Sequence, residues 1–324
     1  MKKIKKNRVV FFNGKFVPEK DAKLSIYDSA LMFGDMVFEM TRSFNKKQFL
    51  LEEHIDRLLS GLKILRIKIR YSKKDLLKIC EKTVAENEKT MNKDDEHRLM
   101  IDVSRGLLGI YENTQSASKG SNVIVADFPL RWTVKGMSKL FSQGINAVIT
   151  SQRAIPPMYM DPKIKNRSRM FYLNANIEAS LFKGKNNWAM LLDSNGFLAE
   201  GTGNNIFIIK NGKVLTPKGI HALRGITRNY VINLCKELKL PVYETDIEPF
   251  DVYNAEEAFV TATPFCMLPV VSLNHIKIGN GRRGKIFNKI LKFWSEKVDV
   301  DIEKQIKRWE TKSQINKLSP YKFK

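Results

Sequence analysis

Cysteine is scarce in this chain, with 3 among 324 residues, at Cys80, Cys235 and Cys266. Three widely spaced cysteines supply neither a disulfide framework nor the close pairs of a zinc site. We therefore expect no metal, and a reducing, cytoplasmic setting. Long apolar runs are also missing, since no stretch approaches the roughly 20 residues of a membrane span. The basic start MKKIKKNRVVFF has too short an apolar part for a signal peptide, so no membrane partner is expected.

Acidic residues are in deficit, because 34 Asp and Glu face 56 Lys and Arg, a formal net charge of +22. A basic surface of this kind can bind nucleic acid. The lysines are scattered along the chain, however, and do not form one stripe interleaved with aromatic residues. We therefore expect no nucleic-acid partner. A length of 324 residues suits two domains better than one.

The most informative stretch is residues 200–228, EGTGNNIFIIKNGKVLTPKGIHALRGITR. Asn211-Gly212 between two apolar runs predicts a β-hairpin. Gly225 and Thr227 directly precede an amphipathic run, so they predict a helix start whose backbone N–H groups can bind an anion. With Glu200 at its beginning, this stretch offers a carboxylate, a hairpin and a phosphate site.

Two further segments carry side chains of interest. Residues 51–65 have leucine and isoleucine at helical spacing, and on this helix His54 and Arg57 share a face. Lys163 and Lys165 precede a second helical pattern at residues 170–181. Taken alone, an arginine on an amphipathic helix or an exposed lysine is usually only solvated.

The remaining secondary-structure elements are predicted from the same apolar patterns and turn residues. They are a hairpin at 9–17, strands at 37–42, 98–106 and 121–129, a helix at 74–90, a hairpin around Asn195-Gly196, a helix at 228–239, a strand, short helix and strand over 241–265, and a helix at 281–298.

In combination, these segments resemble the class IV aminotransferases, the pyridoxal-phosphate family that includes the branched-chain and D-amino-acid aminotransferases. The resemblance rests on the acid at Glu200, the Leu-x-Gly-Ile-x-Arg pattern from Leu223 to Arg228, and the His-x-x-Arg-Leu pattern at His54. A Phe38-Glu39 strand that ends near an arginine matches the N-terminal signature of the family. The resemblance covers roughly residues 8–298.

This resemblance implies a cofactor, pyridoxal 5′-phosphate, and a role for each matching residue. Lys165 would form the Schiff base, with Lys163 as the alternative, and Glu200 would keep the pyridine nitrogen protonated. His54 would either brace Arg57 or contact the cofactor itself. The other implied cofactor-binding residues are Arg57, Gly225, Ile226, Thr227 and Thr263 around the phosphate, and Leu223 on the ring face. The implied substrate-binding residues are Arg42 and Arg98 for a carboxylate, and Phe33 and Phe38 for an apolar part of the pocket.

The fold implied is a two-domain class IV aminotransferase fold of the α/β (α+β) type. We expect a smaller N-terminal α/β domain at 1–128, a connection at 129–139, a larger barrel-like PLP-binding domain at 140–298, and a charged C-terminal extension at 299–324. The resemblance also implies a homodimer with its active site at the domain and subunit interface.

The function implied is a PLP-dependent aminotransferase acting on an amino acid, branched-chain or otherwise hydrophobic, and a 2-oxo acid such as 2-oxoglutarate or pyruvate. Aminodeoxychorismate lyase shares this fold and remains an alternative. An (R)-selective amine transaminase is suggested by the Asp-Pro-x-x-Lys-Asn run at 161–166. A D-amino-acid transaminase is a further alternative, although the Arg-x-His clamp of that group is missing after Arg105-Gly106. A basic binding protein on a disabled scaffold is disfavoured, because Lys165, Glu200 and Arg57 are all present.

Overall fold

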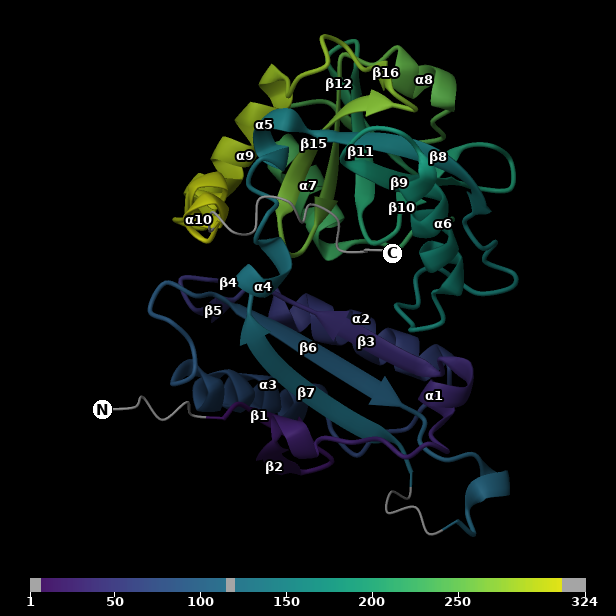
Figure 1. Cartoon of the computed structure of the whole chain (residues 1–324), viewed down its shortest axis with the longest axis vertical. Helices are drawn as coiled ribbons and strands as arrows, with labels where there is room; N and C mark the ends of the chain where they lie inside the picture. The colour runs from purple at the N-terminus through teal and green to yellow at the C-terminus, as the bar shows by residue number, and fades with distance from the viewer. Residues whose placement is uncertain (1–6, 115–119, 311–324) are drawn as a thin grey trace. The chain divides into compact units, whose positions relative to one another are not determined.

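The computed structural model describes residues 7–114 and 120–310 (Figure 1). They form two compact units. The first holds the residues up to Trp132 together with Ile164–Arg169, and the second holds Thr133–Lys163 and the residues from Met170 onward. The change of unit after Trp132 falls inside the connection predicted at 129–139. The sequence predicts residues 164–169 as part of the C-terminal domain, whereas they pack with the first unit. Residues 1–6 and 311–324, at the two ends of the predicted domain scheme, lie outside the described residues.

The first unit is built on a five-stranded antiparallel sheet with the strand order β2-β1-β7-β6-β3. The predicted hairpin is confirmed: Asn13 and Gly14 connect β1 to β2 with positive φ angles. A two-stranded ribbon, β4-β5, is separate from this sheet. The bounds of these strands are Val9–Phe12 (β1), Lys15–Pro18 (β2), Met36–Met40 (β3), Ser43–Phe44 (β4), Lys47–Gln48 (β5), His97–Ser104 (β6) and Asn122–Pro129 (β7).

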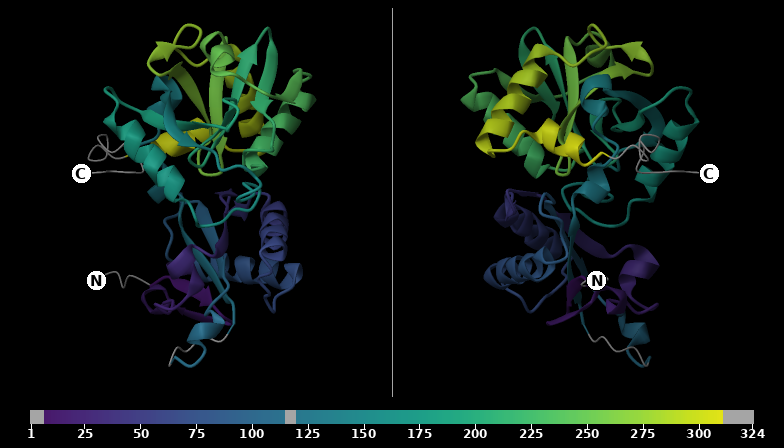
Figure 2. Two further views of the ribbon diagram at one scale, coloured as in Figure 1. Left: turned by 90° about the vertical axis from the view of Figure 1, so that its right-hand side faces the viewer. Right: turned by 60° about the vertical axis from the view of Figure 1, so that its left-hand side comes forward.

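Two helices, α2 (Leu51–Ile64) and α3 (Lys73–Glu88), cover one face of this sheet (Figure 2). Both agree with the predicted helices. Ser72 and Asp75 form a capping box at the start of α3. The core between helices and sheet consists of Val37, Ile55, Leu58, Leu62, Leu76, Leu99, Ile101, Val103 and Val125, with smaller contributions around them. Because side chains alternate along a strand, Phe38, Arg98 and Asp102 lie on the other face of the sheet.

The short helix α1 (Ser29–Phe33) is a feature that the sequence patterns did not indicate. Asp28 caps its N-terminus by accepting a hydrogen bond from the Ala30 N–H, and Gly34 ends it in the left-handed conformation. Single 3₁₀ turns occur at η1 (Glu19–Asp21) and η2 (Gly109–Tyr111). A turn of this length has too few apolar residues for periodicity to reveal it.

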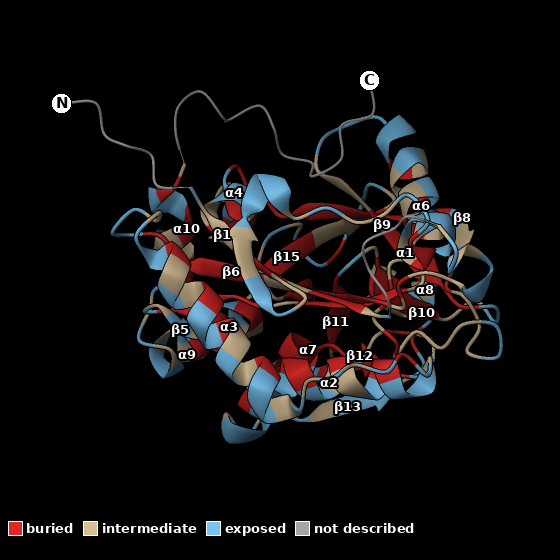
Figure 3. Ribbon diagram, turned by 90° about the horizontal axis from the view of Figure 1, so that it is seen from below, coloured by how far each residue is buried: buried red, intermediate tan, exposed pale blue. Residues whose placement is uncertain are grey.

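The second unit contains a larger mixed sheet with the order β10-β9-β8-β15-β14-β11-β12-β13, to which β16 adds beside β15. The β8-β9, β8-β15 and β12-β13 pairs are parallel and the others are antiparallel. The central strands of this sheet are buried, as the red strands β11 and β15 show in Figure 3. The bounds are Ile145–Arg153 (β8), Asn187–Leu192 (β9), Leu198–Gly201 (β10), Asn205–Lys210 (β11), Lys213–Pro217 (β12), Val242–Thr245 (β13), Glu257–Ala262 (β14), Cys266–Leu273 (β15) and Ile276–Lys277 (β16).

Helices of the second unit pack on this sheet, with α6 against β8 and β9, and with α7 and α9 against β14. The predicted mixed α/β architecture is confirmed, as are the predicted hairpins β9-β10 and β11-β12. Asn211 and Gly212 both have positive φ, which is the turn that Asn-Gly favours between twisted strands. The helices are α4 (Arg131–Val134), which spans the change of unit, α5 (Leu140–Gln143), α6 (Met170–Leu181), α7 (Ile226–Glu237), α8 (Pro249–Tyr253), α9 (Lys285–Lys297) and α10 (Ile302–Arg308).

Three properties of the described residues bear on the exclusions made from the sequence. No helix in this part of the chain is long and apolar enough to cross a membrane. Within the same residues, no cluster of three or more His, Cys, Asp or Glu side chains is arranged to hold a metal ion. Cys80, Cys235 and Cys266 are all buried free thiols.

Candidate active site

Lys165 is fixed to the edge of the first unit's sheet. The Phe38 N–H donates to the Lys165 carbonyl at 2.9 Å, and the Arg167 N–H donates to the Met36 carbonyl at 3.0 Å. Residues 164–169 therefore run along β3 as an added edge segment, which explains why they belong to the first unit. The Lys165 side chain is half-buried, and its Nζ lies 4.8 Å from the centre of the Phe38 ring. The alternative, Lys163, is in the second unit and pairs with Asp161 at 2.7 Å.

Glu39 of β3 binds both His54 and Arg57 of α2. Arg57 Nε lies 2.6 Å from Oε1 and Nη2 lies 2.8 Å from Oε2, while His54 Nδ1 lies 2.7 Å from Oε2. Burial alone would raise the pKa of Glu39, but Arg57 and His54 outweigh it and hold that pKa well below its usual range. The pKa of His54 is lowered, mainly by burial and in part by the charges of Arg57 and Lys165. His54 thus braces the carboxylate that orients Arg57, and Lys165 is close enough to influence it.

Arg98 and Arg42 are two buried arginines of the first unit. Arg98 Nη2 approaches the Met40 sulfur at 3.6 Å, but Nε and Nη1 have no hydrogen-bond partner within the described residues. Burial lowers the pKa of Arg98 to about 10, and the charge of Arg42 acts in the same direction. The Arg42 guanidinium lies 3.8 Å from the centre of the Phe44 ring. A buried guanidinium with two unpaired nitrogens is suited to receive a carboxylate.

The two predicted apolar residues have different environments. Phe33 ends α1 and is 64% exposed. Phe38 is buried, and its ring is covered by the guanidinium of Arg167, with Cζ 3.7 Å from the ring centre. The Phe38 ring therefore carries a cation beside it, which the sequence does not predict. The sequence could not reveal this because the arginine comes from a segment more than 120 residues further along the chain.

Glu200 lies in the second unit, near the end of β10, and is buried. The Tyr172 hydroxyl donates a hydrogen bond to its Oε1, and the Leu223 N–H donates to its Oε2 at 3.0 Å. The Asn205 amide nitrogen lies 3.4 Å from Oε2 and also donates to the Leu223 carbonyl at 2.9 Å. These contacts hold the carboxylate of Glu200 in one orientation and connect it to the loop that carries Leu223.

Helix α7 begins where the sequence predicts an anion site. Gly225 is its N-cap, and no side chain caps it, so the N–H groups of Ile226 and Thr227 stand at an open helix start. A Cβ on Gly225 would lie 2.1 Å from Asn205 Oδ1, so the loop requires glycine here. Thr263 follows the last residue of β14 and is half-buried. Arg228, the last residue of the sequence pattern, is structural: it donates to the Pro217 carbonyl at 2.8 Å and pairs with Glu244.

Each unit therefore contributes a distinct set of groups. The first presents a lysine with an oriented arginine, and the second presents a held carboxylate with an open helix start. A lysine, a buried carboxylate and an open helix start on these two folds are the features that the sequence predicts for an aminotransferase of this class. The family model for class IV amino-transferases matches residues 36–273, and this chain belongs to that family and is a transaminase.

The relatives found by sequence carry one common description. The chain is 36% identical to a putative branched-chain-amino-acid aminotransferase of Methanocaldococcus jannaschii over 282 residues, which cover 87% of this chain and 93% of the relative. It is 30% identical to the branched-chain-amino-acid aminotransferase of Escherichia coli strain K12, with coverage of 88% and 91%. These relatives do not favour the lyase or amine-transaminase alternatives.

Solved structures agree with the sequence comparison. The crystal structure of the Escherichia coli branched-chain amino acid aminotransferase superposes with a TM-score of 0.78 at 30% identity, covering 89% of this chain and 93% of that one. The T.th. branched-chain amino acid aminotransferase complexed with N-(5′-phosphopyridoxyl)-L-glutamate gives a TM-score of 0.78 at 27% identity, with coverage of 90% and 94%. The predicted class IV aminotransferase fold is thereby confirmed.

Sequence reasoning missed several residues that the structure brings to these sites. Glu39 was only part of a motif, although an acid on the helix-covered face of a strand needs a buried partner. Tyr172 is placed against Glu200 by α6, and no local pattern marks it. Asp102 and Arg167 were not singled out either, and they pair at 2.7 Å.

Proposed function

We propose that this transaminase uses pyridoxal 5′-phosphate to move an amino group from a hydrophobic, branched-chain-like amino acid to 2-oxoglutarate. The observation that carries the proposal is the placement of Lys165 beside the Glu39–His54–Arg57 cluster, with its backbone bonded to Phe38. A reactive amine next to an oriented phosphate-binding arginine is what a lysine-bound phosphorylated cofactor requires. The names of the relatives support the hydrophobic donor.

The residues present fit the cofactor. Arg57, whose orientation is fixed by Glu39, and the open N–H groups of Ile226 and Thr227 suit a phosphate dianion, with Thr263 as a further donor. Glu200, held by Tyr172 and Leu223, suits a protonated ring nitrogen. The bound cofactor would supply the electron sink for the carbanion formed at the substrate Cα.

The protein's own residues would perform the remaining steps. Lys165, once displaced by the substrate amine, would take the α-proton at its Nζ and return it on the neighbouring carbon. Glu200 would face the ring nitrogen and keep the proton on that nitrogen, because a carboxylate stabilises an adjacent positive charge. Arg98, with two unpaired buried nitrogens and Arg42 beside it, would bind a substrate carboxylate. Leu223 would pack against the ring face.

The experiment that tests the proposal compares Lys165→Ala with Lys163→Ala. Lys165→Ala is expected to abolish both turnover and the visible absorbance of the lysine-bound cofactor, while Lys163→Ala retains both, because Lys163 is engaged by Asp161. The measurements are an absorbance spectrum of the purified protein and leucine-dependent formation of glutamate from 2-oxoglutarate. A Lys165→Ala protein that keeps the absorbance would move the reactive lysine elsewhere.

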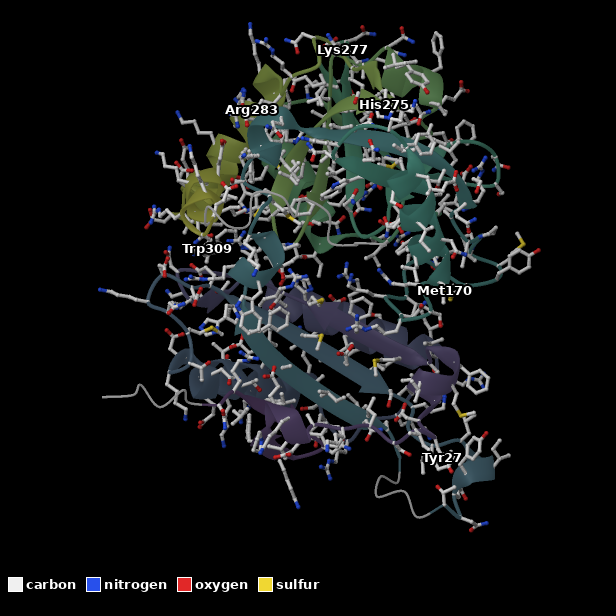
Figure 4. All side chains as sticks on the ribbon, viewed as in Figure 1. Tyr27, Met170, His275, Lys277, Arg283 and Trp309 are labelled. Carbon is white, nitrogen blue, oxygen red and sulfur yellow. The ribbon has the colours of Figure 1, made fainter. Side chains whose placement is uncertain are left out.

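We further propose that the protein is a homodimer and that it is cytoplasmic. Apolar side chains in and before α1 are exposed in the single chain, among them Ile26 at 69%, Leu31 at 68% and Phe33 at 64%. Tyr27, which is next to them and is labelled in Figure 4, stacks on Tyr111. A second copy would cover this surface, and light scattering on the eluted protein measures the mass. Three free buried thiols support the cytoplasmic assignment.

A further inference from the structure

The face of the first unit's sheet that α2 and α3 leave uncovered carries an ordered row of side chains. Phe38 of β3 is the register partner of Asp102 of β6, and the next pair on this face is Met40 with Met100. Arg98 comes two residues further along β6 and touches the Met40 sulfur. The row thus has an acid and an aromatic ring at one end, two thioethers in the middle and an arginine at the other end.

Arg167 is fixed over the aromatic end of this row. Its Cζ lies 3.7 Å from the Phe38 ring centre, and Nε and Nη2 lie 3.0 and 2.7 Å from Asp102 Oδ1. Nη2 also lies 3.4 Å from the Met100 sulfur. A planar guanidinium that is held on one face and along one edge is preorganised to bind a ligand at its other edge. Within residues 7–114 and 120–310, Nη1 makes no hydrogen bond, so the second edge can accept an anion.

These contacts are not needed to hold the segment in place. The backbone of residues 164–169 is already bonded to β3 through Phe38 and Met36. The Arg167 side chain is 35% exposed whereas Asp102 is buried, so the pair supplies the buried carboxylate with its counter-ion and leaves part of the guanidinium accessible. The guanidinium is thus held in one orientation by Asp102 and is still accessible to a ligand.

The surrounding charge favours an additional anion. Lys165 and Arg169 lie 4.8 and 5.0 Å from the same Phe38 ring, so three cations surround it. Of these three cations, Arg167 is the one that contacts Asp102; burial raises the pKa of Asp102, and Arg167 acts in the opposite direction. Three cations lie around the Phe38 ring, and this arrangement attracts an anionic group to this end of the row.

We propose that Arg167 is a specificity-determining residue that binds the distal carboxylate of a dicarboxylic substrate, with Asp102 as its resident counter-ion. The inference rests on the proposed function and deepens it. A 2-oxo acid with two carboxylates would place one on Arg98 and the other on the free edge of Arg167. When a hydrophobic amino acid is bound instead, Arg167 stays paired with Asp102, and the apolar side chain lies against the Met40 and Met100 thioethers. One pocket can then accept both kinds of substrate.

The first test is direct binding to the cofactor-loaded protein, with glutarate and 4-methylpentanoate as unreactive probes. Arg167→Met is expected to weaken glutarate binding about tenfold, because a charge-assisted bidentate contact is lost, and to leave 4-methylpentanoate binding unchanged. The matched control is Arg105→Met. Arg105 belongs to the same unit, pairs with Asp35 and has the same 35% side-chain exposure, but it is not on the Phe38 ring. Parental glutarate affinity in Arg167→Met would overturn the proposal.

Steady-state kinetics separate this inference from the proposed function. In Arg167→Met, KM for 2-oxoglutarate is expected to rise about tenfold while KM for leucine stays at the parental value. If Arg167→Met transaminates leucine with an unchanged KM for 2-oxoglutarate, the role of Arg167 is overturned and the proposed function stays intact. No transamination by the parent with any amino acid would instead overturn the proposed function. If Arg167→Met does not fold, Arg167→Lys is used for the same binding test. Lysine keeps the positive charge but lacks the planar guanidinium that makes bidentate contacts. A loss of about threefold in its glutarate affinity supports the proposal, and parental affinity contradicts it.

Discussion

Glu39 and Arg57 form a buried bidentate ion pair, with Nε 2.6 Å from Oε1 and Nη2 2.8 Å from Oε2. The carboxylate comes from a strand and the guanidinium from the helix that covers it, so the pair joins α2 to β3. His54 bonds the same carboxylate from one turn earlier in the helix. Because the Glu39 side chain is fully buried, its charge depends on these two partners.

The first prediction concerns this pair. Glu39→Gln is expected to lower the free energy of unfolding by about 3 kcal/mol, because a partly buried guanidinium loses its counter-ion. The variant should also bind pyridoxal phosphate more weakly, since Arg57 is no longer held in one orientation. Urea unfolding and cofactor titration measure the two effects. The control is Glu52→Gln on the same helix, whose side chain is 68% exposed and pairs with Lys73, and which should change stability by less than about 0.5 kcal/mol. Equal stability of the two variants would contradict the prediction.

The second prediction concerns Glu200. Glu200→Gln retains the size and much of the hydrogen bonding around Tyr172 and Leu223 but removes the negative charge. Cofactor binding should survive, while the first half-reaction slows by about a hundredfold or more, because the charge that stabilises a protonated ring nitrogen is lost. Single-turnover absorbance changes with leucine measure this rate. A variant that reacts at the parental rate would show that Glu200 only ends a strand.

The third prediction compares two glycines of one loop. Gly225→Ala places a Cβ 2.1 Å from Asn205 Oδ1, and Asn205 in turn contacts Glu200 and Leu223. We expect a loss of about 1–3 kcal/mol in stability from overpacking, together with weaker cofactor binding. Gly219→Ala is the control, because its Cβ would meet only the flexible Arg224 side chain at 3.1 Å. Thermal unfolding and cofactor titration of both variants decide the matter, and matching results for the two would refute the argument.

The fourth prediction is a pH dependence that originates at His97. This buried histidine bonds Asp127 through Nδ1 at 2.7 Å and Glu88 through Nε2, and Lys46 also pairs with Glu88. Burial lowers the pKa of His97, but the two carboxylates more than offset it, so the folded-state pKa is raised. Because the folded state favours protonated His97, the histidine stabilises the fold fully at a pH below its unfolded-state pKa of about 6.5. This stabilisation is lost as the pH rises through the folded-state pKa of His97.

The test is the difference in unfolding free energy between the parent and His97→Gln from pH 6.5 to 9, a range above the pKa of Asp127, which burial raises to about 6. The difference should be largest at the acidic end and shrink as the pH rises. His275→Gln, at an exposed histidine, should follow the parental profile throughout. A difference that grows with pH would show that folding does not raise the pKa of His97.

Local patterns in the sequence determined the elements and most of the side chains now placed in the two units. Asn-Gly pairs specify tight turns because both residues tolerate positive φ, and the hairpins at Asn13 and Asn211 formed as predicted. Helix α2 followed from the spacing of its apolar residues, which also placed His54 and Arg57 on one face. The start of α7 at Gly225 was equally local.

Contacts between distant segments were decided by tertiary structure alone. Residues 164–169 joined the first unit because their backbone completes the edge of β3, and no periodicity in the segment expresses an edge-strand pairing. The same pairing lays Arg167 over Phe38 and against Asp102, so a ring that reads as apolar in the sequence carries a cation in the fold. Hydrophobic periodicity encodes which face of an element is buried, but the partner that covers a polar or aromatic residue depends on how separate elements come together.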